Sequence, residues 1–222
     1  MGIRVRSWQP QRRGGIRRGV RIHLLILLSA APLINVPLIA QDAVKQSTPA
    51  EKKNAAAAAA SRPFGGKPHA IPGSIEAEHY DEGAAEIAYH DVDVKNQGAP
   101  LRGETQVDIE ARPDASGGHG IGWTKAGEWL VYTVNVKEAG TYTLEIPAAS
   151  PKQGGTFHLE FNGVDRTGAI TVPDTGSWQK LGLITKRGIK LDAGVQSMRI
   201  VMDRDGLTNS IGDLDLFRFK RE

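Results

Sequence analysis

The tryptophans of this chain are the first residues whose position suggests ligand chemistry. Trp123 lies between Gly122 and a turn-like run, and Trp178 follows another turn-like run at residues 173–177. A ring at the end of a strand suits sugar recognition, because the C–H face of a pyranose packs on an aromatic plane while placed polar groups bind its hydroxyls. The equally good alternative is that each ring closes an open end of the core. Trp129 lies inside an alternating run, which favours packing in the core or on a sheet face.

Two carboxylates near the start of the domain are spaced so that they share one face of a strand. Glu76 and Glu78 are two residues apart, and the closing strand supplies another acid in Gly212-Asp213-Leu214-Asp215. Neighbouring carboxylates repel unless a cation lies between them, and Ca²⁺ takes carboxylate and carbonyl oxygens in a flexible geometry. The first and last strands of a sandwich often lie side by side, which would bring acids from both ends together. A solvated strand edge is the alternative, and spacing alone favours it.

Catalytic signatures are weak. The six histidines include no pair at metal-binding spacing, and no Gly-x-Ser-x-Gly nucleophile pattern is present. A glycosidase needs two carboxyls that flank a cleft, but the sequence singles out no such pair. Tyr89-His90-Asp91 is the one cluster worth naming. The pattern therefore favours a binding protein over an enzyme.

The elements that must position these residues have the pattern of short β-strands. From Glu128 to Val136, residues alternate with the two-residue period of a strand that has one buried face. Similar runs recur between Gly, Asp, Asn and Pro, and no amphipathic helix of three turns is found. The runs cover residues 74–78, 105–110, 128–136, 141–149, 156–161, 170–172, 178–184, 196–203 and 214–220. They predict an all-β fold, a β-sandwich or jelly roll.

The first 40 residues have the pattern of a secretory signal peptide. Seven arginines and no acidic residue lie in the first 21 positions, an apolar run covers 22–40, and Ala40 provides a small residue for cleavage. An uncleaved membrane anchor is the alternative, although the run is barely long enough to span a bilayer and contains two prolines. We therefore expect an exported protein that is secreted, periplasmic or on the cell surface.

Composition after residue 40 limits the class of function. The whole chain carries a formal charge of +3, but residues 41–222 hold 21 basic and 25 acidic residues, a net charge of −4. This balance argues against nucleic-acid binding, and the absence of cysteine means that the fold must hold without disulfides. Residues 41–70, with an alanine run at 55–60, predict a low-complexity, flexible linker. Residues 71–222 suit a single domain.

Five motifs in the right order resemble carbohydrate-binding module family 6 over residues 71–221. The resemblance is specific because five motifs in sequence are hard to obtain by chance. It implies a non-catalytic β-jelly roll of a kind usually attached to glycoside hydrolases or other polysaccharide-acting enzymes. The motifs are Ile75-Glu-Ala-Glu78, Val107-Asp-Ile-Glu110, Gly122-Trp-Thr-Lys-Ala-Gly-Glu-Trp-Leu-Val-Tyr132, Ala139-Gly-Thr-Tyr-Thr-Leu144 and Pro173-Asp-Thr-Gly-Ser-Trp178.

The resemblance also implies roles for residues of this chain. Trp123 and Trp178 match the two aromatics that sandwich a sugar ring in the family. Asn209 is the best match for an asparagine that hydrogen-bonds the same sugar. Trp129 matches an aromatic that serves a second cleft, on the concave sheet face, in some members. The family's structural calcium would here be held by Glu76, Glu78 and Asp215.

Two departures from the family pattern bear on the site. Leu101-Arg102 stands where many members have Tyr-Arg. The ending Asp213-Leu-Asp-Leu216 stands where many members have Asn-Leu-Asn-Trp. The second departure leaves two candidates, Asn209 and Asp213, for the polar contact with the sugar.

These observations predict an exported, monomeric, non-catalytic protein that binds a polysaccharide or oligosaccharide, with structural Ca²⁺. A polysaccharide-degrading enzyme is a further expected partner, and nucleic acid is not a partner. A membrane becomes a partner only if residues 22–40 stay uncleaved. Two other classes remain open: a small jelly-roll polysaccharide lyase or hydrolase, and an envelope protein-interaction module whose loop tryptophans bind protein.

Overall fold

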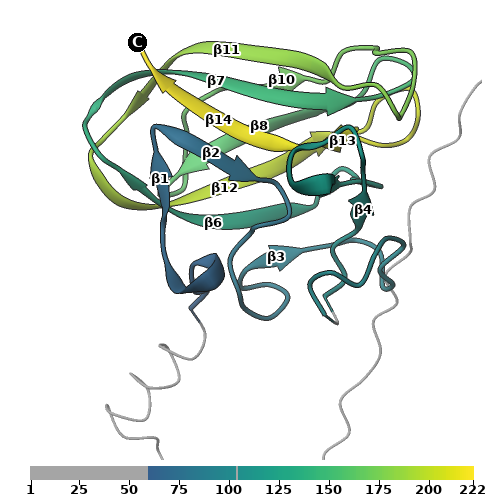
Figure 1. Cartoon of the computed structure of the whole chain (residues 1–222), viewed down its shortest axis with the longest axis horizontal. Coiled ribbons are helices and arrows are strands. Elements are labelled where there is room, and N and C mark those ends of the chain that lie inside the picture. Colours follow the sequence, from purple (N-terminus) through teal and green to yellow (C-terminus); the bar gives the residue numbers. More distant parts are fainter. Residues whose placement is uncertain (1–59, 104) are drawn as a thin grey trace, which may run out of the picture. The chain divides into compact units, whose positions relative to one another are not determined.

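The computed structural model describes residues 60–103 and 105–222, which form two β-sheets packed face to face (Figure 1). The prediction of an all-β sandwich is confirmed. Within this described part the helical elements are two short 3₁₀ turns, η1 (Phe64–Gly66) and η2 (Ser116–Gly118), and no helix is long and apolar enough to cross a membrane. The predicted signal peptide or anchor, and residues 41–59 of the predicted linker, lie outside the described residues.

The first sheet has seven strands around an antiparallel trio. The long strand β12 (Gly194–Arg204) pairs with β6 (Trp129–Val136) on one side and with β8 (Thr156–Phe161) on the other. The shorter strands of this sheet are β1 (His69–Ile71), β3 (Tyr89–His90), β9 (Val164–Asp165) and β10 (Ile170–Thr171).

The second sheet also has seven strands and is built on β7 (Gly140–Ala149). Strand β7 pairs with β11 (Gly182–Leu191) along one edge and with β14 (Leu216–Arg221) along the other. Next to β14 lies β2 (Gly73–Glu76), with Glu76 opposite Leu216, so the two ends of the domain are neighbours as expected. The remaining strands are β4 (Ile109–Ala111), β5 (His119–Ile121) and β13 (Asp213–Leu214).

The core lies between the sheets and follows the alternation seen in the sequence. In β6 the even-numbered residues of 130–136 are buried, whereas Trp129 lies half-buried on the outer face. Tyr132 is fully buried; its hydroxyl donates to the Ala77 carbonyl at 2.7 Å, and its ring meets Phe217 of the other sheet edge-on. The polar end of this large side chain is therefore satisfied inside the core.

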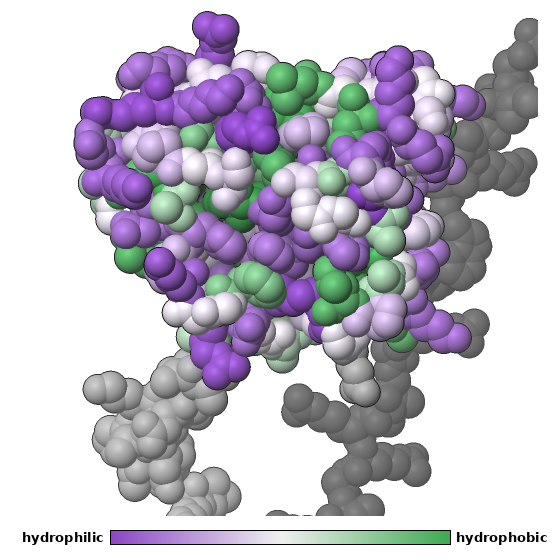
Figure 2. Space-filling view, in the orientation of Figure 1, coloured by the Kyte–Doolittle hydropathy of each residue, from purple (hydrophilic) through white to green (hydrophobic). Residues whose placement is uncertain are grey.

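The outer face of the second sheet is polar. Glu145 on β7 accepts a hydrogen bond from Lys220 at 2.6 Å and lies 3.6 Å from the guanidinium of Arg218, and both of these partners are on β14. Figure 2 shows a hydrophilic surface over the upper-left part of the view, where Figure 1 places β11, β7 and β14. This face has the composition of an ordinary solvent-exposed surface.

Ordered structure begins before residue 71, the first residue of the predicted domain. Strand β1 pairs in parallel with β6, and Arg62 forms a bridge with Glu82. Phe64 stacks on His79 with ring centroids 4.1 Å apart, and the guanidinium of Arg102 lies 4.7 Å from the Phe64 centroid. Periodicity could not reveal this segment, because its strand is three residues long and its partners lie far along the chain.

Several strand bounds also differ from the prediction. The run 105–110 yields only β4, and the run 178–184 yields β11, which starts at Gly182 and continues to Leu191. The register of β11 against β7 shifts between Lys186 and Ile189, and this bulge interrupts the alternation that a sequence pattern relies on. Because β11 starts at Gly182, Trp178 lies in the loop before it rather than at the start of a strand.

Candidate binding site

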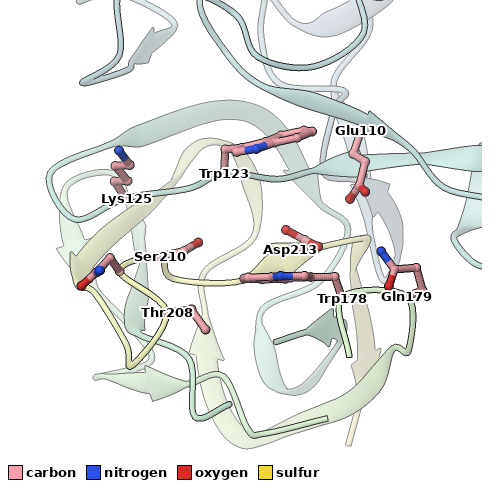
Figure 3. Close-up of a pocket in the computed structure, with 9 residues that line it drawn as sticks. Glu110, Trp123, Lys125, Trp178, Gln179, Thr208, Ser210 and Asp213 are labelled. Atoms are coloured by element: carbon pink, nitrogen blue, oxygen red, sulfur yellow. The ribbon is translucent and has the colours of Figure 1, made fainter. Parts of the chain in front are cut away.

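A cavity of about 360 Å³ lies between two loop tryptophans (Figure 3). Figure 3 shows the rings of Trp123 and Trp178 nearly edge-on, on opposite sides of the cavity. The structure thus brings together Trp123, Trp178 and both candidates for the polar contact with the sugar, Asn209 and Asp213. The remaining lining comes from strand ends and loops: Glu110, Lys125, Gln179, Thr208 and Ser210.

Trp123 is positioned by its neighbours rather than by burial, since 41% of it is exposed. Its backbone φ is +49°, a region that a bulky residue rarely adopts. The hydroxyl of Thr124 donates to the Gly212 carbonyl at 2.6 Å, and the Thr124 carbonyl accepts from the hydroxyl of Ser210 at 2.9 Å. These bonds tie two pocket loops together and hold the ring in place over the cavity.

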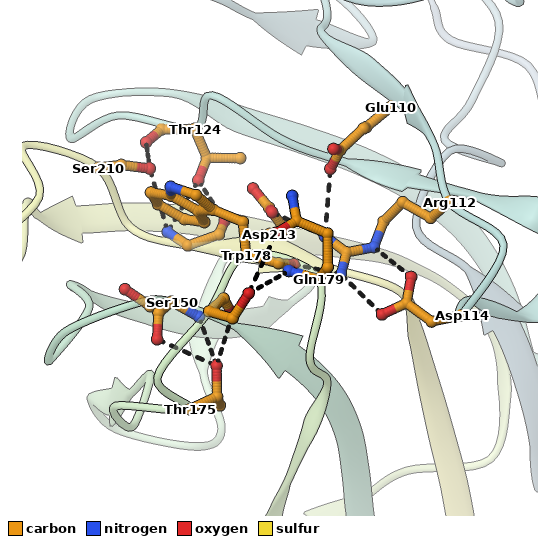
Figure 4. Close-up of polar contacts among 12 residues, drawn as sticks. Glu110, Arg112, Asp114, Thr124, Ser150, Thr175, Trp178, Gln179, Ser210 and Asp213 are labelled. Atoms are coloured by element: carbon orange, nitrogen blue, oxygen red, sulfur yellow. Dashed lines mark hydrogen bonds and ion pairs between the residues drawn. The ribbon is translucent and has the colours of Figure 1, made fainter.

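Trp178 belongs to a loop that is held in a similar way (Figure 4). The Thr175 backbone N–H donates to the Ser150 carbonyl at 2.8 Å, and the Ser150 N–H donates to the Thr175 hydroxyl at 3.0 Å. Beyond this turn, Nη2 of Arg112 donates to the Trp178 carbonyl at 2.6 Å. The second ring is therefore also fixed through its backbone.

Next to Trp178, the guanidinium of Arg112 holds three carboxylates (Figure 4). This side chain is only 3% exposed. Its Nη1 donates to Glu110 at 3.1 Å and to Asp213 at 2.7 Å, and its Nε and Nη2 donate to Asp114 at 3.2 and 3.0 Å. Charge-assisted hydrogen bonds of this kind are stronger than neutral ones. One arginine therefore fixes Glu110 and Asp213, which form the acidic floor of the cavity, and Trp178, which forms one of its walls.

The two carboxylates of the floor interact strongly with each other. The pKa of Asp213 is raised from 3.8 to about 7, first by burial and then by the Glu110 carboxylate, against the opposing charge of Arg112. A Cβ atom on Gly122 would lie 3.2 Å from Asp213 Oδ1 and 3.6 Å from Glu110 Oε2. Both acids therefore flank the backbone that leads into Trp123, which explains the glycine at that position.

The rim supplies further polar groups. Asn209 has a φ of +55°, a conformation that asparagine tolerates better than most residues. The Oγ1 atom of Thr208 is buried and has no hydrogen-bond partner among the described residues. An unsatisfied hydroxyl in a cavity lining is free to bond a ligand hydroxyl.

Several of these residues were not predicted from the sequence. Glu110 closes one of the five motifs, so its position carried a signal. Arg112 carried none, because its partners Asp213 and Trp178 lie 101 and 66 residues away in the chain. Thr208 is an ordinary loop residue in the sequence.

The sequence model described as carbohydrate binding module (family 6) matches residues 97–221, more than half of the chain. This chain belongs to carbohydrate-binding module family 6. The resemblance inferred from the five motifs is confirmed, and the function of the domain is carbohydrate binding.

Two curated relatives contain segments similar to this module. The clotting factor G alpha subunit of Tachypleus tridentatus is 30% identical over 102 residues, which are 45% of this chain and 15% of that protein. The β-agarase AgaA of Microbulbifer thermotolerans is 30% identical over 89 residues, which are 40% of this chain and 19% of that protein. The chain thus spans less than a fifth of the length of either relative.

Solved family 6 modules share the jelly-roll fold. The module from Cellvibrio mixtus lichenase 5A, solved in complex with cellotriose, is 25% identical with a TM-score of 0.50, covering 68% of this chain and 98% of that one. A β-1,3-glucan-binding module from Bacillus halodurans is 22% identical with a TM-score of 0.51, covering 69% and 99%. The C-terminal module of the laminarinase LamC from Zobellia galactanivorans is 21% identical with a TM-score of 0.51, covering 67% and 98%.

Trp129 of the module does not line the cavity between Trp123 and Trp178. It lies on the outer face of the first sheet, where its ring stacks with His90 at a centroid distance of 6.2 Å. The guanidinium of Arg199, itself paired with Glu160, lies 5.6 Å from the Trp129 centroid. The second cleft that the family resemblance implies would be a separate surface from this pocket, and it stays a prediction.

The three predicted calcium ligands of the module come from neighbouring segments. The Asp215 carbonyl accepts from the Ala77 N–H at 2.9 Å, which joins the segment of Asp215 to the end of β2. Strand β2 ends at Glu76, so Glu78 lies in the turn that follows rather than on the predicted strand 74–78. Ser116 bridges the same groups, because its hydroxyl donates to Glu76 Oε1 at 2.8 Å and its N–H donates to Asp215 Oδ1 at 2.9 Å.

The chemistry of this acidic cluster fits a hard cation in part. Oε2 of Glu76 and Oε2 of Glu78 are buried without a hydrogen-bond partner in the described residues. Burial, with the nearby carboxylates adding to it, raises the pKa of Glu78, and burial likewise raises the pKa of Asp215 to about 6. In residues 60–103 and 105–222 no three His, Cys, Asp or Glu side chains are grouped tightly enough to form a metal site on their own. Backbone carbonyls or waters would have to complete the coordination of Ca²⁺.

Proposed function

We propose that this module holds one or two sugar units of a polysaccharide in the cavity, with a ring between Trp123 and Trp178. The sugar hydroxyls would bond Asn209, Asp213 and the free hydroxyl of Thr208. The observation that supports this proposal is the pair of fixed, projecting indole rings on opposite sides of a cavity with polar groups between them.

The proposed site is small, and its affinity should be modest. Two stacking faces and a few hydrogen bonds correspond to dissociation constants from millimolar to micromolar, or about −4 to −8 kcal/mol. Useful retention would then come from repeated sites on a polymer or from a tethered partner, which raise the effective concentration.

We propose that the pocket binds without catalysing a reaction. Glu110 and Asp213 are the two acids of the floor, and both contact the same nitrogen of Arg112. A glycosidase instead places its carboxyls on opposite sides of the scissile bond. The shared nitrogen supports a role as a hydrogen-bonding floor, so the lyase or hydrolase alternative has no specific support from this geometry.

The remaining parts of the proposal rest on residues outside the pocket. Ca²⁺, if bound, would be held by Glu76, Glu78 and Asp215, where it would neutralise their mutual repulsion and join the first and last strands. The basic and apolar pattern of residues 1–40 supports export. The similarity to a segment of an agarase supports a polysaccharide-degrading enzyme as a partner.

An affinity-gel panel of neutral and acidic polysaccharides tests the proposal. The purified protein should be retarded by at least one polysaccharide, and Trp123→Ala and Trp178→Ala should each abolish the retardation while the circular dichroism spectrum is retained. Val164→Ala removes an exposed apolar side chain from a strand that does not line the cavity and should change nothing.

Trp129→Ala in the same panel examines the second cleft. Loss of retardation in this variant alone would move the binding site to the outer face of the first sheet. If no polysaccharide retards the protein, or if both loop variants bind as well as the wild type, the sugar-clamp proposal fails. Binding of a protein partner that oligosaccharides do not displace would then favour the interaction-module alternative.

A further inference from the structure

The acidic floor of the pocket, together with the adjacent Asp114, carries more negative charge than the single Arg112 neutralises. Glu110, Asp114 and Asp213 all contact Arg112, so three carboxylates surround one guanidinium. Even if two of these acids share one proton, the group keeps a surplus negative charge. The surplus is partly shielded from water, because the side chains of Arg112 and Asp213 are 3% and 7% exposed.

The other charged group in the lining does not reverse this balance. Lys125 lines the rim, where its side chain is 41% exposed and its Nζ lies 3.4 Å from the carboxylate of Asp93. An exposed, paired ammonium is well screened by water and salt. The floor, by contrast, lies where screening is weak and where charges act most strongly.

Asp213 and Glu110 are the two acids that line the cavity, whereas Asp114 is not part of the lining. Each has one oxygen near the position that a Cβ on Gly122 would occupy, and Gly122 precedes the stacking ring of Trp123. A ring stacked there would therefore place its substituents close to these oxygens.

We propose that the pocket selects its sugar by charge: it takes a neutral ring, rejects a ring that carries a carboxylate or sulfate, and owes this rejection to Asp213 and Glu110. The inference rests on the proposed function, because it concerns the ring that stacks between the two tryptophans. It deepens that function by naming the class of polysaccharide. Neutral polymers are bound, and polymers rich in uronic acid or sulfate are not.

The test compares charged and uncharged forms of one oligosaccharide. Cellotriose, its derivative with C6 oxidised to the carboxylate, and the methyl ester of that acid are titrated into the full protein by calorimetry at neutral pH. The acid should bind at least about tenfold more weakly than its methyl ester, because the two have nearly the same shape. If another neutral oligosaccharide binds better in the affinity panel, the same three forms of that sugar are used.

Variants then assign the rejection to residues. Asp213→Asn and Glu110→Gln should each bring the ratio of the two dissociation constants, acid over methyl ester, to within about threefold of unity. Each substitution removes a negative charge and keeps a hydrogen-bonding group. Lys125→Gln should widen the ratio. Glu138→Gln removes a carboxylate at the opposite end of β6, where Glu138 pairs with Arg221, and should leave the ratio unchanged.

Each of the other outcomes overturns the inference or the function beneath it. If the acid and the ester bind as well as cellotriose, the pocket does not discriminate by charge. If both bind equally more weakly than cellotriose, the shape of the substituent causes the loss of affinity. A ratio that neither floor variant changes places the discrimination elsewhere. Failure of every neutral oligosaccharide to bind would instead count against the proposed function, and is thereby distinguished from failure of charge selection alone.

Discussion

Two acidic clusters meet around residues 213–215, and they differ in what balances their charge. Asp213 belongs to the pocket floor, where the guanidinium of Arg112 contacts all three carboxylates. Asp215 belongs to the cluster with Glu76 and Glu78, in which two carboxylate oxygens are buried and unpartnered. The first cluster contains its own cation, whereas the carboxylates of Glu76 and Asp215 in the second accept hydrogen bonds from the hydroxyl and the backbone N–H of Ser116.

One short segment therefore contributes to both a candidate ligand site and a junction between strands. Buried carboxylates are tolerated only when hydrogen bonds or cations compensate for lost water. An arginine supplies the compensation permanently and also positions Trp178 through its carbonyl. The cluster without an arginine depends on protons or on a cation from solution, so its stability should respond to conditions.

Removal of the arginine should have the largest effect. Arg112→Met leaves three neighbouring carboxylates without a cation, and we expect the free energy of unfolding to fall by about 3–5 kcal/mol, as for other broken buried ion pairs. Sugar retention should also be lost, because the backbone of Trp178 loses its donor. Denaturant unfolding and the affinity gel measure the two effects.

Arg112→Lys is the matched control, since it keeps the charge but cannot present the planar fork to all its partners. It should lie between the wild type and Arg112→Met in stability. A lysine variant that equals the wild type in both stability and retention would contradict the role assigned to the guanidinium geometry.

Addition of calcium should have the next largest effect, and should act on the second cluster alone. A free calcium concentration of about 100 times the dissociation constant would stabilise the fold by about 2.7 kcal/mol. This stabilisation corresponds to a rise in Tm of roughly 5–10 °C for a domain of this size. Thermal unfolding with calcium and with a chelator measures the rise.

Glu78→Gln serves as the control for calcium, because it replaces one ligand with a neutral group of the same shape. The rise in Tm should shrink or vanish in this variant, and it should persist in Asp213→Asn. A Tm that is the same with calcium and with a chelator would show that this cluster relies on protons instead.

Glu128 is a third buried acid, and its hydrogen bonds come from backbone donors rather than from an arginine. Glu128 accepts from the Lys125 N–H at 2.9 Å, and its pKa is raised from 4.5 to about 8, first by burial and then by nearby carboxylates, with Asp91 ahead of Asp108. Its folded state holds the proton that the unfolded state releases above about 4.5. Its contribution to stability is therefore complete below that pH and is lost as pH rises towards 8.

Glu128→Gln should flatten this part of the stability profile. The wild type should lose Tm between about pH 5 and pH 8 more steeply than the variant, and the two should differ least at the acidic end, where both side chains are neutral. Thermal unfolding across a series of buffers gives the two slopes. Parallel slopes would mean that Glu128 does not take up a proton on folding.

Substitution of Trp123 should have the smallest effect on stability and a complete effect on binding. The ring is 41% exposed and its φ of +49° suits glycine better than tryptophan. Trp123→Gly should therefore change the free energy of unfolding by less than about 1 kcal/mol while it abolishes sugar retention. A large loss of stability would show that the ring is a packing residue.

The strand pattern was readable where one face of a strand is buried along its whole length. Strand β6 follows the alternation from residue 129 to 136, and β8 agrees residue for residue with its prediction. The pattern failed at β11, where a bulge interrupts the alternation, and at β1, where three residues pair with a distant strand. Local periodicity reports burial of one face, and it cannot report strands whose existence depends on a partner.

The features of the candidate site also divide into those that the sequence indicates and those that depend on the tertiary structure. The sequence alone determined the family, the all-β fold and the two loop tryptophans, because those depend on short motifs whose residues stay together in the chain. Only the tertiary structure decided that Trp123, Trp178, Asn209 and Asp213 share one cavity, and that Trp129 lies outside it. The role of Arg112 could not be predicted from the sequence, since Coulomb interactions and hydrogen bonds depend on distance in space, and folding alone brings residues 112, 178 and 213 together.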